Sequence, residues 1–342
     1  MTKERRTTLK DIATAVGCSS GLVSYVLNGR GDEMRISKAM QQRVIDTARE
    51  MKYQSNVYAK SIREGVEYSP MFTFFWPYQL NTNLLNACFA GLHEVQHTAQ
   101  FEFAIVLQMY ETHQLYQYQK YMQANRTNGA LVFCASENDR KFLEETHLPI
   151  PTVCLNDQFA NQSCAYLDRV KLSSQVADLI LQAGYQSVGL LGGWIYPHHR
   201  LQARLITEAL RPHGIYISQS CFQERPISEN SGAEVIHLLL AEAKKPPQLI
   251  VSLSDRVARG ANYALQQAGF LCPSDVSILV MSDRYRRQES SFIDWSVVQF
   301  PIDKMCSWAI NKLLKADSCL EPQIESREFA AEFFLKDHFF MK

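Results

Sequence analysis

The sequence predicts an α/β protein that begins with a three-helix head. Residues 8–51 carry apolar side chains at helical spacing, and turn signals at Gly17 and at Asn28 with Gly29 divide them into short segments. From about residue 70, short apolar runs alternate with amphipathic helices. This alternation is typical of α/β units with mostly parallel sheets.

Composition limits the class of protein. The 342 residues suffice for two or three domains, and 46% hydrophobic with 20% charged residues is typical of a soluble globular chain. No apolar run reaches the ~20 residues that span a bilayer, and no signal peptide is recognisable, so we expect a cytoplasmic protein without a membrane segment. The nine cysteines are scattered without zinc spacing, which predicts reduced thiols and no metal site.

The zero net charge is unevenly distributed. Residues 1–65 hold 12 Lys and Arg against 7 Asp and Glu, a net +5. The remainder holds 23 against 28, a net −5. A basic head on an acidic body suggests a polyanionic partner for the head alone.

Caps define the helices of the head. Thr8 and Asp11 have the spacing of a capping box, Gly17 permits the left-handed turn that closes the first helix, and Ser19 or Ser20 caps the second. The third helix runs from about residue 37 to 51. The predicted inward side chains are Leu9, Ile12, Ala13, Val16, Leu22, Val23, Val26, Leu27, Met40, Val44, Ile45, Ala48 and Met51.

Three short helices with a tight glycine turn between the first two predict a helix-turn-helix domain. In that arrangement the second helix enters the DNA major groove with its N-terminal residues leading. Here the second helix carries small polar residues where a surface helix normally carries charge, so it can approach base edges closely. A small exposed helical bundle without a DNA role is the alternative.

The head resembles that of the LacI/GalR family of transcription regulators, whose pattern runs L-x-D-I-A-x-x-A-G-V-S-x-x-T-V-S-x-V-L-N. The matching residues are Leu9, Asp11, Ile12, Ala13, Gly17, Ser19, Val23, Ser24, Val26, Leu27 and Asn28. The resemblance continues through residues 43–45 and 52–53 to Asn56, Ala59, Ile62 and Gly65.

The resemblance implies which head residues contact DNA. The base-reading positions are Ser20, Gly21 and Tyr25, and the phosphate-contacting positions are Ser19, Ser24, Asn28 and Ser37. Tyr25 replaces the family's frequent Arg and Gly21 has no side chain, so the base preference does not transfer from relatives. The loop of residues 29–36 is longer than usual, and its Arg30 and Arg35 are candidates for backbone contacts.

Residues 55–66 are expected to form a hinge between the head (residues 1–54) and the body (residues 67–342). A helix this short is marginal in water, so it could fold only on DNA. By resemblance, two hinge helices of a dimer meet in the minor groove and insert an apolar side chain, here Ile62. The other implied contacts are Asn56, Ala59 and Lys60. A plain linker is the alternative.

The body shows the alternating pattern in detail. Strands are predicted at residues 72–76, 103–108, 130–134, 152–155, 187–191, 249–253 and 276–281, with helices at 84–97, 171–183 and 258–268.

The family resemblance extends over the body. Residues 273–283 resemble the signature P-x-D-V-S-V-V-G-F-D-D, and residues from Gln299 onward resemble the return to the first subdomain. This implies two doubly wound parallel-sheet lobes, like periplasmic sugar-binding proteins, joined by three crossovers. The expected limits are about 67–166 with 298–325 for lobe 1, and about 167–297 with 326–342 for lobe 2.

Ligands in such sheets bind at the carboxyl ends of strands, here between the lobes. At positions where sugar-binding relatives hold hydroxyls with charged and amide side chains, this chain has Asn156, Gln202, Ser254 and Ser282. These softer side chains argue against a sugar pocket of the usual kind. Arg200 and Arg204 are alternatives to Gln202, and Asp255 lies near the predicted cleft mouth.

Aromatic and basic residues are further candidates for ligand contacts. Trp76, Tyr78 and Trp194 are predicted at strand ends, where they could stack on a ring, although lobe core or a dimer surface is an equal alternative. His198 and His199 could meet an anion, but a solvated loop is the favoured interpretation.

The sequence therefore predicts a DNA-binding transcriptional repressor that acts as a homodimer on a pseudo-palindromic double-stranded operator. A sugar or another metabolite bound between the lobes is expected to change operator affinity. No nucleophile elbow, phosphate loop or zinc-protease motif is present, so we expect neither an enzyme nor a cofactor. The alternative is control by a protein corepressor, or no small-molecule effector at all.

Overall fold

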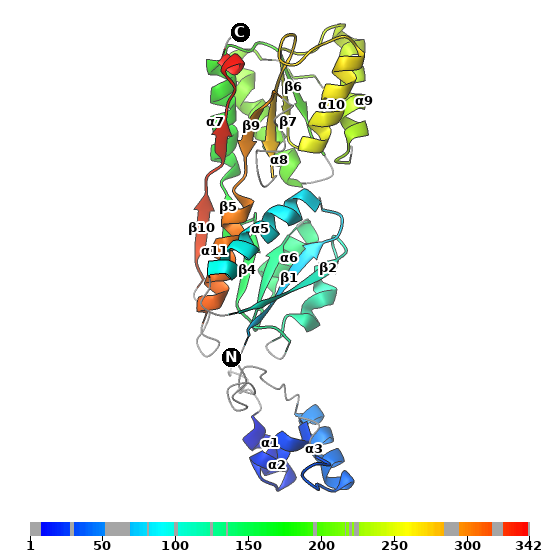
Figure 1. The fold of residues 1–342 in the computed structure, drawn as a ribbon, viewed down its shortest axis with the longest axis vertical. Helices are drawn as coiled ribbons and strands as arrows, with labels where there is room; N and C mark the ends of the chain where they lie inside the picture. Colours follow the sequence, from blue (N-terminus) through cyan, green and yellow to red (C-terminus); the bar gives the residue numbers. More distant parts are fainter. Residues whose placement is uncertain are drawn as a thin grey trace. The chain divides into compact units, whose positions relative to one another are not determined.

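The computed structural model describes residues 8–27, 31–51, 69–80, 82–98, 102–123, 126–134, 136–193, 197–215, 217–218, 221, 226–283, 294–316 and 324–340. The chain divides into two units (Figure 1). One unit is the head with helices α1 to α3, and the other is the α/β body that begins at Ser69.

The head begins with a doubly capped helix, α1 (Leu9–Val16). The Thr8 hydroxyl accepts a hydrogen bond from the Asp11 N–H at 3.2 Å, and the Asp11 carboxylate accepts one from the Thr8 N–H at 2.7 Å. The predicted capping box is therefore confirmed. Gly17 has a φ of 76° and its N–H donates to the Ala13 carbonyl, which ends the helix as predicted.

Helices α2 (Ser20–Leu27) and α3 (Lys38–Glu50) complete the head. The buried core of the head consists of Ile12, Ala13, Val16, Val23, Val26, Val44 and Ala48. The prediction that Ile45 points inward is wrong, because its side chain is 36% exposed. Neighbours on a helix point about 100° apart, so when Val44 and Ala48 face the core, Ile45 turns toward solvent.

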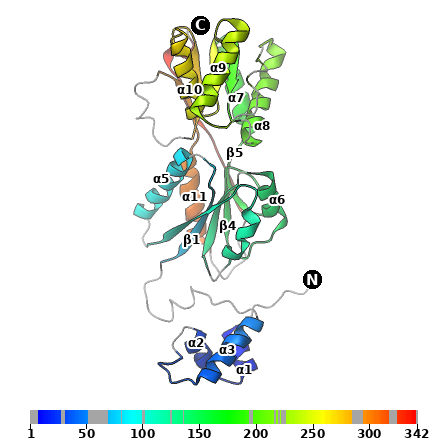
Figure 2. The same ribbon diagram turned by 90° about the vertical axis from the view of Figure 1, so that its right-hand side faces the viewer.

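Lobe 1 of the body is a six-stranded parallel sheet in the order β10-β5-β4-β3-β1-β2. Its strands are β1 (Met71–Pro77), β2 (Ala104–Tyr110), β3 (Gly129–Phe133), β4 (Thr152–Leu155), β5 (Ser163–Leu167) and β10 (Ser326–Phe329). Helices α5 (Thr82–Thr98) and α11 (Ile302–Lys315) cover one face, and α6 (Glu137–Glu145) and the short η1 (Leu115–Tyr121) lie on the other (Figure 2). Such two-sided cover explains why the central strands are continuous apolar runs.

Lobe 2 has a five-stranded sheet in the order β11-β9-β8-β7-β6. Its strands are β6 (Val188–Leu191), β7 (Leu249–Ser252), β8 (Ser277–Ser282), β9 (Ser296–Gln299) and β11 (Glu332–Phe334), of which β11 runs antiparallel to β9. Helices α9 (Glu229–Ala243) and α10 (Asp255–Gln267) pack on one face, with α7 (Arg169–Gln182) and α8 (Pro197–Leu210) on the other (Figure 2). The short helices η2 (Arg211–His213) and η5 (Asp337–Phe340) complete the described elements.

The chain passes between the lobes three times, from β5 to α7, from β9 to α11 and from β10 to β11. The expectation that lobe 2 resumes at residue 326 is wrong, because β10 pairs with β5 in lobe 1, with Ser326 opposite Cys164. As an edge strand β10 is largely exposed, so no apolar run marks it in the sequence.

The helices α9 and α10 pack with their backbones in close contact, and glycine makes this possible. A Cβ added at Gly260 in α10 would lie 1.7 Å from the Glu229 carbonyl oxygen, and one at Gly232 in α9 would lie 2.0 Å from the Val257 carbonyl oxygen. None of the helices within the described part of the chain is long and apolar enough to cross a membrane.

We expect Gly260→Ala to lower the free energy of unfolding of the body by about 1–3 kcal/mol, because overpacking forces α9 and α10 apart. Urea denaturation followed by circular dichroism measures the change. Gln266→Ala, on the exposed side of the same helix, is the control and should stay within about 0.5 kcal/mol of the parent. Equal stability of Gly260→Ala and the parent would contradict the packing described here.

Candidate nucleic-acid interface and ligand cleft

The N-terminal half of α2 presents an exposed surface without charged side chains. Ser19 caps this helix, since its hydroxyl accepts a hydrogen bond from the Leu22 N–H at 3.2 Å. Ser20, Gly21 and Tyr25 are exposed. A Cβ added at Gly21 would meet only the Ser19 hydroxyl, at 3.9 Å. A helix surface of such small residues can approach the edges of bases closely.

Ser37 lies at the start of α3, where its hydroxyl accepts a hydrogen bond from the Met40 N–H at 3.3 Å. The preceding loop is tied to the same helix, because the Asp32 carboxylate binds Lys38 Nζ at 2.7 Å and the Gln41 amide at 2.9 Å. The hydrogen bond from Lys38 lowers the pKa of Asp32. These contacts hold residues 31–36 of the loop against α3.

Several predicted DNA contacts lie outside the described residues, namely Asn28, Arg30, Asn56, Ala59, Lys60 and Ile62. Ser24 is described and is partly buried in α2. The roles of all these residues in DNA binding remain predictions.

A cleft in the body lies at the carboxyl ends of strands from both sheets. Its polar and aromatic lining includes Asn156 after β4, Arg169 after β5, His198 after β6, Ser254 after β7, Asp283 after β8 and Phe300 after β9. Gln202 also lines the cleft, so Asn156, Gln202 and Ser254 are brought together as the sequence suggested. Parallel strands in both lobes thus deliver their following loops and helix starts to one place.

Arg169 is the cation among the described residues that line this cleft. It is the first residue of α7, which Asp168 caps. Its guanidinium donates hydrogen bonds to Asn156 Oδ1 at 3.0 Å and to Gln202 Oε1 at 3.3 Å, and both acceptors are neutral amides. Burial lowers the pKa of Arg169 to about 10, so the side chain remains protonated at neutral pH.

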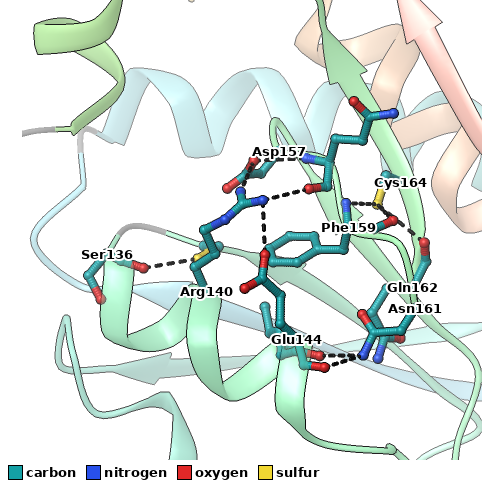
Figure 3. A network of polar contacts seen from close by, with 11 residues as sticks. Ser136, Arg140, Glu144, Asp157, Phe159, Asn161, Gln162 and Cys164 are labelled. Carbon is teal, nitrogen blue, oxygen red and sulfur yellow. Dashed lines mark hydrogen bonds and ion pairs between the residues drawn. The ribbon is translucent and has the colours of Figure 1, made fainter.

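Arg140 in α6 contacts Asp157 and Phe159 in the segment that directly follows Asn156 (Figure 3). Its guanidinium pairs with the Asp157 carboxylate at 2.5 Å, donates to the Gln158 carbonyl at 3.0 Å, and lies 4.8 Å from the Phe159 ring centre. Asn156 itself has a φ of 64°, a left-handed conformation that asparagine adopts more readily than most residues. Arg140 is therefore a positioning residue for the cleft.

His198 and His199 occupy the first turn of α8 and line the cleft, so the prediction that they lie in a solvated loop is wrong. The Gly193 N–H donates to His199 Nδ1 at 3.1 Å, which leaves the proton of the neutral ring on Nε2. Burial, and then the charge of Arg169, lower the pKa of His199 to about 3. Burial also lowers the pKa of His198. Both rings are therefore uncharged at neutral pH.

Two serine hydroxyls organise the wall that lobe 2 contributes to the cleft. Ser254 lines the cleft and caps α10, with its hydroxyl accepting from the Arg256 N–H at 3.3 Å. Ser282 is 2% exposed and donates to the Asp255 carboxylate at 2.8 Å. Ser282 and Asp255 are thus placed behind the wall, which they support, rather than in the lining.

Two of the predicted aromatic residues, Trp76 and Tyr78, are not part of the cleft lining. Trp76 is 1% exposed and packs against Phe74 and Phe133 in the core of lobe 1, because β1 is covered by helices on both faces. Tyr78 follows the end of β1 and is 52% exposed. Trp194 lies outside the described residues.

The predicted arginines of α8 also point away from the cleft. Arg200 and Arg204 are exposed, and Arg204 approaches Glu208 at 3.8 Å. Gln202, which is 2% exposed, takes the inward position. Residues two positions away on a helix lie on the opposite side, so Gln202 facing inward turns both arginines outward. In the described residues, no group of three or more His, Cys, Asp or Glu could hold a metal ion.

Sequence reasoning missed Arg169. It lies two residues after β5, a five-residue strand of sequence Ser-Cys-Ala-Tyr-Leu that is not among the predicted strands, and one residue after the helix cap Asp168. A signal was available in the short hydrophobic run of residues 164–167, since a charged residue just after a strand lies at its carboxyl end.

We expect the stability of the body to fall as the pH drops below about 6.5, the pKa of histidine in an unfolded chain. The pKa of His199 is about 3 in the folded protein, so between these values the unfolded chain binds more protons and unfolding is favoured. His199→Asn, whose amide oxygen can replace Nδ1 as acceptor, should weaken this pH dependence, measured as urea midpoints between about pH 6.5 and 5.

His237→Asn is the matched control, because His237 is exposed on α9. It should keep the pH dependence of the parent. An unchanged slope in His199→Asn would show that this ring is not held neutral by the fold.

Comparisons with known proteins agree with this arrangement. Residues 8–56 match the family model for bacterial regulatory proteins of the lacI family, and residues 177–327 match that for the periplasmic binding protein-like domain. The ribose operon repressor of Haemophilus influenzae is 26% identical over 290 residues, 81% of this chain and 82% of that protein. The sucrose operon repressor of Klebsiella pneumoniae is 44% identical over 63 residues, 18% of this chain and 19% of that protein.

Solved structures share the fold. A LacI family transcription regulator from Clostridium acetobutylicum has a TM-score of 0.70 at 20% identity, covering 79% of this chain and 100% of its own. The lac repressor dimer bound to operator and the anti-inducer ONPF has a TM-score of 0.64 at 17% identity, covering 97% and 98%. With family models matching both the head and a large part of the body, the chain belongs to the lacI family of bacterial regulatory proteins.

Proposed function

We propose that this protein is a sequence-specific DNA-binding transcriptional repressor whose operator affinity is set by a small molecule bound between its lobes. It acts in the cytoplasm as a homodimer on a pseudo-palindromic, double-stranded operator, and it catalyses no reaction. Relatives that match the head or most of the chain are regulators by name, including the ribose and sucrose operon repressors.

The observation that carries the DNA-binding part is the exposed, uncharged start of α2. In a helix-turn-helix head this helix enters the major groove, and small residues allow base edges to come close. Ser20 and Tyr25 supply hydroxyl groups there, and Gly21, which has no side chain, leaves room for a base edge to approach the helix. Two heads of a dimer would read half-sites about one helical turn apart, roughly 34 Å. The lac repressor among the structural neighbours is a dimer bound to operator.

The cleft supports the regulatory part. Its lining comes from both lobes, and three chain crossovers join those lobes. A ligand that touches both lobes can favour one arrangement of them over another. It changes operator affinity only as far as it binds those arrangements with different affinities. The regulator CelR, a structural neighbour, has been solved as a complex with cellobiose.

We expect Tyr25→Ala to reduce the preference for operator over unrelated DNA by about 1–3 kcal/mol, the usual range for one base contact. The operator is first selected from a random duplex pool with the parent protein. Fluorescence anisotropy at several salt concentrations then gives the affinity for this duplex and for a scrambled one. Both affinities should fall with rising salt, because phosphate contacts release counterions.

Gln42→Ala, an exposed substitution on α3 of the same head, is the control and should bind both duplexes as the parent does. Recovery of no preferred sequence would contradict the proposal. So would an equal loss of affinity for both duplexes in Tyr25→Ala.

A further inference from the structure

We propose that the cleft ligand is a small polyhydroxylated acid, and that Arg169 binds its carboxylate or phosphate group. This inference rests on the proposed function, in which the cleft holds an effector, and it adds the chemical class of that effector.

Arg169 carries a charge that its described neighbours do not neutralise. Its contacts are to the amide oxygens of Asn156 and Gln202, and among the described residues it forms no ion pair with a carboxylate. Asp157 is the carboxylate that acts on it electrostatically, but Asp157 is already paired with Arg140 at 2.5 Å. A guanidinium has five N–H donors, so the two amides leave three for a ligand.

The position of Arg169 in its helix also disfavours a cation. The first turn of a helix carries partial positive charge, so stability alone would favour a neutral or acidic residue at the start of α7. The starts of α8 and α10 contribute His198, His199 and Ser254 to the same cleft. An anion in the cleft would therefore meet Arg169 together with several helix N-termini, all of which attract it.

The remaining lining indicates what else the ligand carries. Asp283 is a carboxylate in the same lining, so a ligand that is negative throughout would be repelled by it. Hydroxyl groups would suit this part of the cleft, because a carboxylate accepts hydrogen bonds from them. Leu84, Ile227 and Phe300 supply apolar surface against which a carbon skeleton can pack. A ligand with an acidic group at one end and hydroxyl groups on the rest of its carbon skeleton would suit Arg169, Asp283 and the apolar side chains of the lining together.

The test uses the full-length protein and matched pairs of compounds that differ in one acidic group. The pairs are glucose with glucuronate, galactose with galacturonate, and glucose or ribose with its terminal phosphate. Thermal unfolding identifies binders and isothermal titration calorimetry gives their dissociation constants. We expect at least one acid to bind at least about tenfold more tightly than its neutral partner, the lower range for a charge-assisted hydrogen bond. Comparing the uronates with the sugar phosphates shows whether the ligand group that Arg169 binds is a carboxylate or a phosphate.

The variant Arg169→Met separates a ligand-binding role from a structural one. Methionine keeps the length of the side chain but removes the charge, so the acid should bind at least about tenfold more weakly. Without ligand the variant should be at least as stable as the parent, because an uncompensated charge has been removed from the cleft. Arg211→Met, on the exposed surface of η2, is the control and should bind the acid like the parent.

Three results would overturn the inference. These are neutral compounds binding as tightly as their acids, no binding by any acid of the panel, or an Arg169→Met variant that unfolds more easily without ligand. The last result would make Arg169 a structural tie between Asn156 and Gln202. Operator affinity measured on the same samples distinguishes these failures from failure of the proposed function, because selective DNA binding by the head does not require an acidic ligand.

Discussion

Strand direction is the constraint on which the rest of the body depends. Every strand pair in lobe 1 and every pair but β9–β11 in lobe 2 is parallel among the described strands. A parallel strand returns to its sheet through a crossover on one face, so the carboxyl ends of all such strands share one edge. In both lobes these edges supply the cleft lining, and the helices that follow begin there with their N–H groups unpaired by the helix itself. Asn156 and Asp283, which are far apart in the sequence, thereby line one site.

Several features of the cleft suit ligand binding but lower the stability of the folded protein. Neutral histidines, a cation at a helix start and a left-handed asparagine each have a cost in the absence of ligand. The fold maintains them through surrounding contacts, such as the ion pair and carbonyl contact by which Arg140 holds the turn after Asn156 (Figure 3). In the head, the requirements of DNA binding and of stability conflict less. The helix expected to read bases lacks charged side chains, and its order relies on the Ser19 cap and on buried Val23 and Val26.

Much of this architecture could be predicted from local sequence. The capping box at Thr8 and the glycine turn at Gly17 depend on neighbouring residues, and the apolar strands were recognised because burial on both faces demands continuous apolar runs. Prediction failed where tertiary packing decides. Trp76 lies in the core of lobe 1, which was one of the alternatives left open for it, Ile45 is exposed while Val44 is buried, and β10 is an exposed edge strand. The cleft was predicted in part, since Asn156, Gln202 and Ser254 line it, but Arg169 follows β5, a short strand that begins with the small residues Ser163, Cys164 and Ala165 and lacks β-branched residues.

Ligand binding in the cleft and DNA binding by the head are thermodynamically coupled in the proposed mechanism. Its most direct test is a reciprocal titration of the purified protein. Operator affinity is measured with and without saturating cleft ligand, and ligand affinity is measured with and without saturating operator. We expect the two affinities to change by the same factor, typically 5–150-fold for allosteric proteins, because coupling free energy is reciprocal. Operator affinity that is identical with and without bound ligand would contradict it.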